Sequence, residues 1–332
     1  MSRARNVILV TGCPRSGTTP VGTNLALANG VRYLYEPFNP NFGLRVMSRF
    51  YEVPGANDFS FERLDGCVDA IRRVQLDLKP FDWPREKGVR RIVKRLIGGR
   101  ARMAYLACRL DWSLKTVIWK DPTACLAAKD VAERHNIPVV VTVRPAVAVA
   151  ASYKRMQWDS GVGAVLDSLA QVGIEFAELR ADYGQHFANS AIGAAALWHV
   201  IYTTLLRWSE TTPDMHFVAL QDTIDRPLET YRSLYAILGL PWSDAVAEKL
   251  ARRYAAKSSA RATPSAALPQ RAHVSGRSLN DVNTYGRKLL TPDETRMIEE
   301  ISAATWALLE ARRAGIRAPV PLGESPASVA RC

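Results

Sequence analysis

The sequence predicts an α/β fold in which helices cover both faces of one parallel β-sheet. Short runs of β-branched and other apolar residues recur along the chain, and segments with helical periodicity separate them. The first apolar run leads directly into a glycine-rich turn. Such runs are typical of strands buried on both faces, and their alternation with helices is typical of a parallel sheet. We therefore expect a single domain over residues 1–332, with helical insertions.

The individual strands and helices can be placed from these patterns. Strands are expected at residues 6–11, 31–35, 116–120, 138–143 and 216–220. Helices are expected at residues 18–29, 124–135, 146–156, 190–210, 227–238, 243–256 and 291–313. Gly30 would follow the end of the first helix, because glycine is common just beyond a helix C-cap. Most of the expected strands are thus followed by a helix, as parallel pairing requires.

The composition favours a protein that binds anions, and it indicates neither a metal site nor a disulfide framework. The net charge is +12, and a basic surface attracts phosphates, sulfates and acidic lipids. The five cysteines include no C-x-x-C pair and the five histidines include no H-x-x-x-H pair, so reduced thiols and no metal site are expected. No segment resembles a membrane span or a secretory leader, because the N-terminus runs directly into an apolar strand. A cytoplasmic protein is therefore expected.

Several segments do not follow the strand–helix alternation. Residues 40–115 form a long interval that we expect to be a helical insertion. Within it, residues 85–109 carry nine lysines or arginines and one acid. This stretch is either a solvated helix face or a surface that guides an anionic substrate or touches a membrane. Residues 257–277 are expected to form a loop, and residues 320–332 a flexible tail.

The turn after the first strand is a candidate anion-binding loop. Gly12 and Gly17 have the spacing of the phosphate-binding pattern G-x-x-x-x-G-K-[ST]. Glycine lets backbone N–H groups converge on an anion, and the N-terminus of the next helix adds partial positive charge. Thr18 replaces the lysine that an NTPase needs, and the cation lies inside the loop as Arg15. This favours an anion other than ATP, although a strand–turn–helix junction without a ligand uses the same residue types.

The loop also resembles one in a known family. Residues Cys13-Pro14-Arg15-Ser16-Gly17-Thr18-Thr19 resemble the 5′-phosphosulfate loop of sulfotransferases that use PAPS (3′-phosphoadenosine 5′-phosphosulfate), commonly P-[KR]-S-G-T-[TS]. The resemblance implies a P-loop-NTPase-like fold, PAPS as the donor, PAP (adenosine 3′,5′-bisphosphate) as the product, and no metal. It also implies that the donor contacts the following residues: Pro14, Arg15, Ser16, Gly17, Thr18 and Thr19.

A second anion site is implied by Arg144 and Ser152. In the sulfotransferase family an arginine ends a strand and a serine follows eight residues later on the next helix, and both bind the donor's 3′-phosphate. Arg144 directly follows the expected strand 138–143, and Ser152 lies eight residues further on. A strand end and a position two turns into the next helix can reach one ligand, and the fork of an arginine suits a phosphate. The resemblance therefore assigns both residues to the 3′-phosphate.

Glu36 and Lys120 are the candidates for the chemical step. The cytosolic branch of the family has a histidine base two residues after a lysine, but Pro122 occupies that position here. Residues 33–38 are similar to the glutamate-proline segment of the carbohydrate branch, which implies that Glu36 is the general base. Lys120 would then neutralise the leaving phosphate. Alternatively, Glu36 pairs with an arginine and Lys120 is a surface charge. Asp121 is a candidate base, substrate ligand or helix N-cap, and its position favours the N-cap.

The chain departs from the family pattern where adenine is usually bound. Pro20 follows the loop at a position where many relatives have an aromatic residue, and Leu220-Gln221-Asp222-Thr223 replaces the common motif Y-E-D-L. No residue is therefore assigned to the purine. Residues 285–290 resemble the basic segment before the family's last helix, so Arg287 or Lys288 is implied as a further contact to the 3′-phosphate.

Together these features predict an enzyme that moves a sulfuryl group from PAPS to a hydroxyl, or less readily to an amine. The acceptor would be a carbohydrate, a lipid-linked sugar or another small molecule, and residues 40–115 would shape its site. Arg15 would act in both donor binding and catalysis. Two alternatives stay open, a P-loop kinase or NTPase and a non-catalytic protein that binds nucleic acid or a membrane through its charge. The leading interpretation involves no nucleic acid, and the sequence indicates no oligomeric state.

Overall fold

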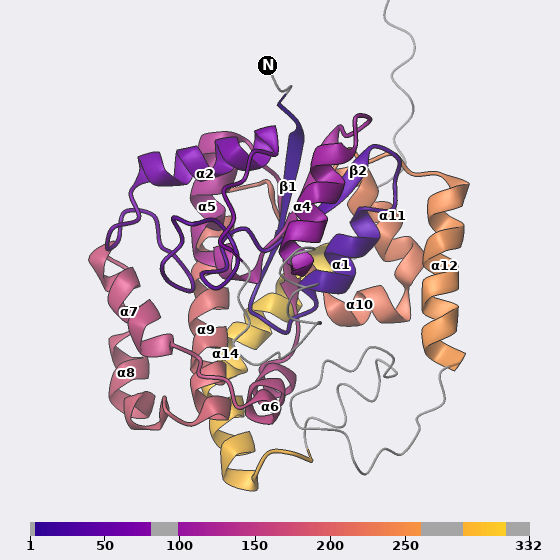
Figure 1. The fold of residues 1–332 in the computed structure, drawn as a ribbon. Helices are drawn as coiled ribbons and strands as arrows, with labels where there is room; N and C mark the ends of the chain where they lie inside the picture. The colour runs from indigo at the N-terminus through magenta and orange to yellow at the C-terminus, as the bar shows by residue number, and fades with distance from the viewer. Residues whose placement is uncertain (1–3, 81–98, 260–287, 317–332) are drawn as a thin grey trace, which may run out of the picture.

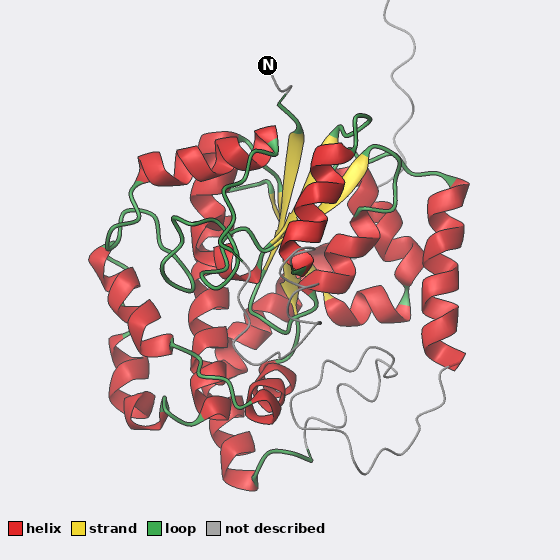
Figure 2. Cartoon of the chain, viewed as in Figure 1, coloured by secondary structure: helices red, strands yellow, loops and turns green. Residues whose placement is uncertain are grey.

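A parallel sheet of five strands forms the centre of the protein, as the sequence predicts. The structure is a computed structural model that describes residues 4–80, 99–259 and 288–316. The strand order is β2-β3-β1-β4-β5. The strands are β1 (Asn6–Thr11), β2 (Val31–Tyr35), β3 (Thr116–Lys120), β4 (Val139–Val143) and β5 (Met215–Ala219). Helices surround this sheet (Figures 1 and 2), so the predicted α/β class is confirmed.

Helices pack against both faces of the sheet and form two separate cores. The helices are α1 (Thr18–Leu25), α2 (Phe61–Arg73), α4 (Arg100–Leu110), η1 (Pro122–Ala127), α5 (Ala128–His135), α6 (Ala146–Met156), α7 (Val162–Gln171), α8 (Ala177–Tyr183), η2 (Gly184–His186), α9 (Ser190–Ser209), α10 (Leu220–Asp225), α11 (Pro227–Ile237), α12 (Asp244–Ser259) and α14 (Pro292–Ile316). Trp119 belongs to the core with α2, α5, α6 and α9, whereas its neighbour Ile118 belongs to the core with α1, α11 and α12. This is the alternation expected of successive strand residues.

The register of the strands brings their carboxyl ends to one edge of the sheet. Lys120 at the end of β3 lies opposite Val10 of β1 on one side and opposite Tyr35 of β2 on the other. On the far side of β1, strand β4 pairs in the same direction, and its last residue Val143 lies opposite Ala219 of β5. Loops that follow parallel strands meet at this edge, which is where such sheets bind ligands.

Helix α1 is shorter than the sequence predicts. It ends at Leu25 instead of residue 29, so Gly30 does not follow its end but lies in a turn before β2. The hydroxyl of Tyr235 donates to the carbonyl oxygens of Asn24 and Leu25, at 2.8 and 3.0 Å. These carbonyls therefore have a partner outside the helix, and the chain can leave the helical path there.

Smaller differences concern where other elements begin. The helix expected at 124–135 starts earlier, as η1, and continues as α5. The fifth strand begins and ends one residue earlier than expected, because Leu220 already belongs to α10. Helix α12 runs to Ser259 and so enters the expected loop at 257–277, the rest of which lies outside the described residues.

Residues 40–115 are helical only in part. Helices α2 and α4 lie in this interval, whereas residues 44–60 form turns and irregular backbone. The carboxylate of Glu52 organises this irregular part, since one of its oxygens accepts hydrogen bonds from the amides of Ser48 and Arg49, at 3.1 and 3.0 Å. Most of the basic segment 85–109 and all of the predicted tail lie outside the described residues. Among the helices that are described, none is long and apolar enough to cross a membrane.

Candidate active site

The turn between β1 and α1 has a backbone that requires glycine at both ends. Gly12 has a φ of 131° and Gly17 a φ of 102°, values that residues with a side chain rarely adopt. A Cβ atom at Gly12 would lie 2.5 Å from the carbonyl oxygen of Thr142. Between the two glycines, Arg15 also has a left-handed φ, of 72°. The loop is therefore a fixed structure, and its last residues present the first amides of α1, which lack helical acceptors.

Buried hydroxyls hold this loop against β4. Ser16 Oγ and Thr142 Oγ1 lie 2.8 Å apart, and Thr142 Oγ1 donates to the carbonyl of Thr11 at 3.1 Å. Ser16, predicted as a donor contact, is fully buried, so its hydroxyl serves the loop itself. Pro14 and Thr18 are also buried, whereas Thr19 is exposed on the first turn of α1.

Arg15 connects the loop to the predicted second anion site. Its Nε donates to Ser152 Oγ at 2.8 Å, and Arg144 Nη1 donates to the backbone carbonyl of Arg15 at 3.2 Å. The structure therefore brings together the three residues that the sequence predicts to bind the two ends of a donor. Arg15 belongs to the loop, Arg144 follows the end of β4, and Ser152 belongs to helix α6.

Three cations, Arg15, Arg144 and Arg155, lie near one another at this point. Burial lowers the pKa of Arg144 well below its usual value, and the nearby Arg15 and Arg155 lower it further. Burial and Arg155 likewise lower the pKa of Arg15. Clustered cations that destabilise one another are stabilised by a bound anion, since an opposite charge favours their protonated forms. The cluster of Arg15, Arg144 and Arg155 is thus suited to a multiply charged anion.

Side chains of helix α9 form hydrogen bonds to the backbone of the loop and of the end of β4. Trp198 Nε1 donates to the carbonyl of Arg144 at 2.8 Å. One helical turn further, the hydroxyl of Tyr202 donates to the carbonyl of Thr142 at 2.6 Å and accepts from the amide of Cys13 at 3.3 Å. These buried bonds fix the end of β4 relative to the loop.

Glu36 and Lys120 meet at the ends of β2 and β3. Lys120 Nζ donates to Glu36 Oε1 in a buried ion pair, and Asn39 Nδ2 donates to Glu36 Oε2 at 2.9 Å. Lys120 is only 1% exposed, so it is not a surface charge, and the partner of Glu36 is a lysine instead of an arginine. Burial lowers the pKa of Lys120, and Glu36 opposes this effect. The Lys120 ammonium also lies 4.2 Å from the centre of the Tyr35 ring.

The ion pair and the arginine cluster belong to one site. Burial and Arg155 are the main causes that lower the pKa of Arg15, and Tyr35 and Glu36 act in the opposite direction. Electrostatic coupling of this kind requires the groups to be near one another. Arg15 of the loop is therefore coupled electrostatically to the candidate general base, and it also contacts Ser152 of the second anion site.

Asp121 is structural. It is the N-cap of η1, as one alternative predicts, and it is fully buried. One carboxylate oxygen accepts from the amide and the hydroxyl of Thr123, at 3.1 and 2.6 Å. The other accepts from the amide of Phe38 at 2.6 Å and from Trp119 Nε1 at 3.2 Å. With four donors on its two oxygens, this carboxylate is occupied by the protein.

Sequence reasoning missed some groups near the site. The guanidinium of Arg15 lies 5.8 Å from the centre of the Trp158 ring, and that ring packs edge-on against Tyr153. Trp158 and Arg155 follow Ser152 within a few residues, and that closeness in sequence is the signal that could have found them. Tyr35 lies next to Glu36 in the segment that carries the family resemblance, but it has no predicted role.

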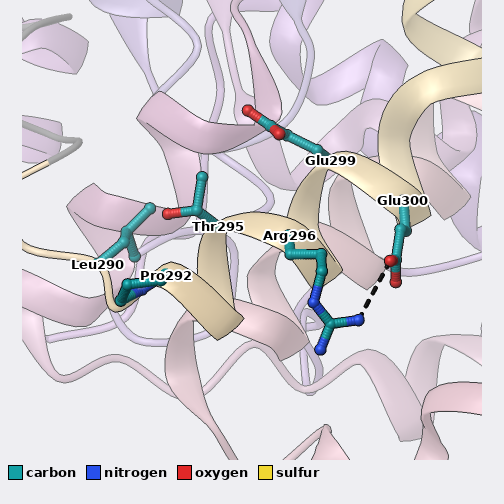
Figure 3. Close-up of a pocket in the computed structure, with 6 residues that line it drawn as sticks. All are labelled: Leu290, Pro292, Thr295, Arg296, Glu299 and Glu300. Atoms are coloured by element: carbon teal, nitrogen blue, oxygen red, sulfur yellow. Dashed lines mark hydrogen bonds and ion pairs between the residues drawn. The ribbon is translucent and has the colours of Figure 1, made fainter.

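Two other features bear on the boundaries of the site. Arg287 and the residues just before it lie outside the described residues, so its predicted contact stays a prediction. The residues that line a surface hollow, drawn in Figure 3, all lie between positions 290 and 300, and they include the ion-paired Arg296 and Glu300. No residue of the loop or of the Glu36–Lys120 pair lines that hollow. Within the described parts of the chain, no cluster of three potential metal ligands occurs.

Comparison with solved structures gives distant similarities. The sulfotransferase domain from the curacin biosynthetic pathway is 14% identical over 90% of this chain and 98% of that chain, with a TM-score of 0.44. Sulfotransferase STF9 from Mycobacterium avium is 14% identical over 92% of this chain and 77% of that chain, with a TM-score of 0.41. Mouse sulfotransferase SULT7A1, whose structure is a complex with PAP, is 12% identical over 94% of this chain and 90% of that chain, with a TM-score of 0.39.

No protein-family model matches the sequence, and no curated protein matches it. The identities and TM-scores of the similar structures are too low to assign an activity. The functional assignment therefore depends on the geometry of the site itself.

Proposed function

We propose that this protein is a sulfotransferase that transfers the sulfuryl group of PAPS to a hydroxyl of an acceptor. One observation carries the proposal. Arg15 of the glycine-bounded loop contacts Ser152, and Arg144 contacts the backbone of Arg15. A ligand that fits this arrangement has two separate anionic groups, and PAPS has a 5′-phosphosulfate and a 3′-phosphate.

The loop and the arginine cluster divide the donor between them. The first amides of α1, with Thr18, Thr19 and Arg15, hold the 5′-phosphosulfate in this proposal. Arg144 and Ser152 hold the 3′-phosphate, where a planar guanidinium can form two parallel hydrogen bonds. PAP is the product and occupies the same groups.

The Glu36–Lys120 pair supplies the chemistry that the transfer needs. The acceptor oxygen forms a bond to sulfur while the bond from sulfur to the bridging phosphate oxygen breaks. The acceptor proton passes to the Glu36 carboxylate, which forms an ion pair with Lys120. Lys120 and Arg15 stabilise the negative charge that develops on the leaving phosphate.

The geometry favours this function over a kinase or NTPase. An NTPase holds magnesium with a loop hydroxyl and an acid on a neighbouring strand. Here Asp121 follows β3, next to β1, but its oxygens already accept four hydrogen bonds from the protein. Such enzymes have a lysine directly after the second glycine of the loop, whereas this chain has Thr18 at that position.

The acceptor class is proposed from the base. A glutamate at this position resembles the carbohydrate branch of the sulfotransferases, so we propose a sugar hydroxyl, free or lipid-linked, as the acceptor. Residues 40–115 are proposed to shape its binding site, since α4 and the irregular stretch before α2 lie on the chain segment that follows Glu36.

Calorimetric titration tests the donor. PAP should bind more tightly than ADP or AMP, and Arg144→Ala should weaken PAP binding by about 10- to 100-fold while AMP binding changes little. Arg252→Ala, which removes an exposed arginine of α12, is the matched control and should leave PAP binding unchanged. If ADP bound as well as PAP, or if Arg144→Ala left PAP affinity intact, the assignment would be wrong.

A further inference from the structure

Helix α4 exposes apolar side chains along its outer face. Met103 is 49% exposed, Leu110 is 78% exposed, and Trp112, just beyond the helix, is 100% exposed. Met103, Ala107 and Leu110 are spaced by four and three residues, so they lie on one side of the helix. Large apolar residues on a surface are ordinary when they are scattered, but a stripe that ends in a fully exposed tryptophan indicates a binding surface.

Positive charge flanks this stripe. Arg102 and Arg109 are exposed, and they lie seven residues apart on α4, next to the apolar positions. Asp111, an acid at the end of the helix, forms an ion pair with Arg32 of β2 at 2.6 Å. The outer face of α4 is thus apolar along its middle and basic along its side.

We propose that this face, formed by Arg102, Met103, Arg109, Leu110 and Trp112, binds the surface of an anionic phospholipid bilayer. A helix with an apolar stripe and flanking arginines lies in the plane of the membrane interface, with the arginines at the level of the lipid phosphates. Tryptophan favours this same level, because its ring is apolar and its N–H is polar. Anionic lipids attract each exposed cation, which adds to the burial of the apolar side chains.

The charge of the molecule argues against a second copy of this chain as the occupant. A symmetric contact through this face would bring the arginines of both copies together, and each chain has a net charge of +12. An anionic lipid surface neutralises these charges instead. Charge complementarity therefore favours the bilayer.

The position of α4 relates this surface to the active site. The helix packs along β2 (Figure 1), where Cys108 Sγ lies 3.7 Å from the carbonyl of Tyr33. At the other end of the helix, the guanidinium of Arg100 lies 5.5 Å from the centre of the Tyr35 ring, next to Glu36. A bilayer bound along α4 would consequently lie beside the end of β2 that carries the candidate base.

Vesicle binding by the full chain tests the proposal. Vesicles of phosphatidylcholine with about 30% phosphatidylserine should co-sediment with the protein, and pure phosphatidylcholine vesicles should not. The double variant Arg102→Gln, Arg109→Gln should bind at least about tenfold more weakly, and high salt should weaken binding by the native chain. The control pair Arg226→Gln, Arg252→Gln removes the same charge from exposed sites elsewhere and should bind normally.

Two further variants identify the contact itself. Trp112→Ser should weaken binding, whereas Trp112→Phe should keep it and lose the energy transfer from Trp112 to a dansyl-labelled lipid. Leu308→Ser, at a leucine that is 60% exposed on α14, is the apolar control. The proposal is overturned if the native chain does not bind these vesicles. It is also overturned if the charge control and the Leu308→Ser control lose as much binding as the variants of the α4 face. It is also overturned if the chain is a dimer in lipid-free solution that Trp112→Ser dissociates.

Discussion

The carboxylate of Glu36 and the ammonium of Lys120 form a buried ion pair that joins the carboxyl ends of β2 and β3. Asn39 holds the second oxygen of Glu36 at 2.9 Å. Because both side chains are buried, each charge depends on the other, and loss of one partner leaves an uncompensated charge in the interior. Removal of either partner should therefore destabilise the fold in addition to any effect on the proposed reaction, and separate measurements can distinguish the two effects.

The first prediction concerns Glu36→Gln. This change keeps the size of the side chain but removes the proposed proton acceptor. Transfer of radiolabelled sulfuryl groups from PAPS to a panel of sugars and glycolipids should fall by about 10²- to 10⁴-fold. PAP binding, measured by calorimetry, should change little. The control Glu294→Gln alters another glutamate paired with a lysine, Lys154, and should keep its activity; normal transfer by Glu36→Gln would exclude Glu36 as the base.

The second prediction concerns Arg144→Lys. The lysine keeps the charge but loses the planar fork and the hydrogen bond from Arg144 to the carbonyl of Arg15. PAP should bind roughly tenfold or more weakly, while AMP, which lacks the 3′-phosphate, should bind almost as before. Calorimetry with both nucleotides is the measurement. An equal loss for the two nucleotides would indicate a general disturbance of the site instead of a 3′-phosphate contact.

The third prediction concerns Gly12→Ala. The new Cβ would lie 2.5 Å from the carbonyl oxygen of Thr142, at a residue with a φ of 131°. Gly161 also has a positive φ, of 64°, but open space surrounds the position of its Cβ. Gly161→Ala should therefore lower the free energy of unfolding by only about 1 kcal/mol, and Gly12→Ala by several times as much. Urea denaturation of both variants compares them, and equal effects would show that the contact with Thr142 is unimportant.

The fourth prediction concerns pH and Asp121. Burial first, and then Glu36, raise the pKa of its carboxyl from 3.8 to about 6. The folded protein thus keeps this proton between pH 3.8 and about 6, whereas the unfolded chain loses it. Stability due to this group is present below that window and is lost as the pH rises through it.

Asp121→Asn provides the reference for that measurement, because it does not titrate. The free energy of unfolding of the native chain, relative to this variant, should fall by about 3 kcal/mol across the window. Urea denaturation at a series of pH values gives the difference. A difference that does not depend on pH would contradict the raised pKa.

The strands and the loop could be predicted because local sequence determines them. Buried parallel strands need continuous β-branched residues, and the left-handed backbone at Gly12 and Gly17 needs glycine. The family resemblance added Glu36, Lys120, Arg144 and Ser152. The structure brings Glu36 against Lys120, and Ser152 and Arg144 against Arg15.

The rest depends on contacts between distant parts of the chain. The early end of α1 depends on Tyr235, which a pattern over neighbouring residues cannot reveal. The hydrogen bonds from α9 to the loop and to the end of β4 could not be predicted either, because Trp198 and Tyr202 look like ordinary residues of an apolar helix. Likewise, Ser16 belongs to a loop motif, but its partner Thr142 determines that its hydroxyl is buried.

The hydroxyl of Tyr202 has a consequence for the order of events during synthesis. It links the amide of Cys13 to the carbonyl of Thr142, so the loop and the end of β4 are fixed to each other by a helix made much later than the loop. A nascent chain that has left the ribosome only as far as α6 contains every arginine of the cluster but lacks this link. The proposed nucleotide site is therefore complete only after α9 has docked, so nucleotide binding would report that this half of the protein has folded.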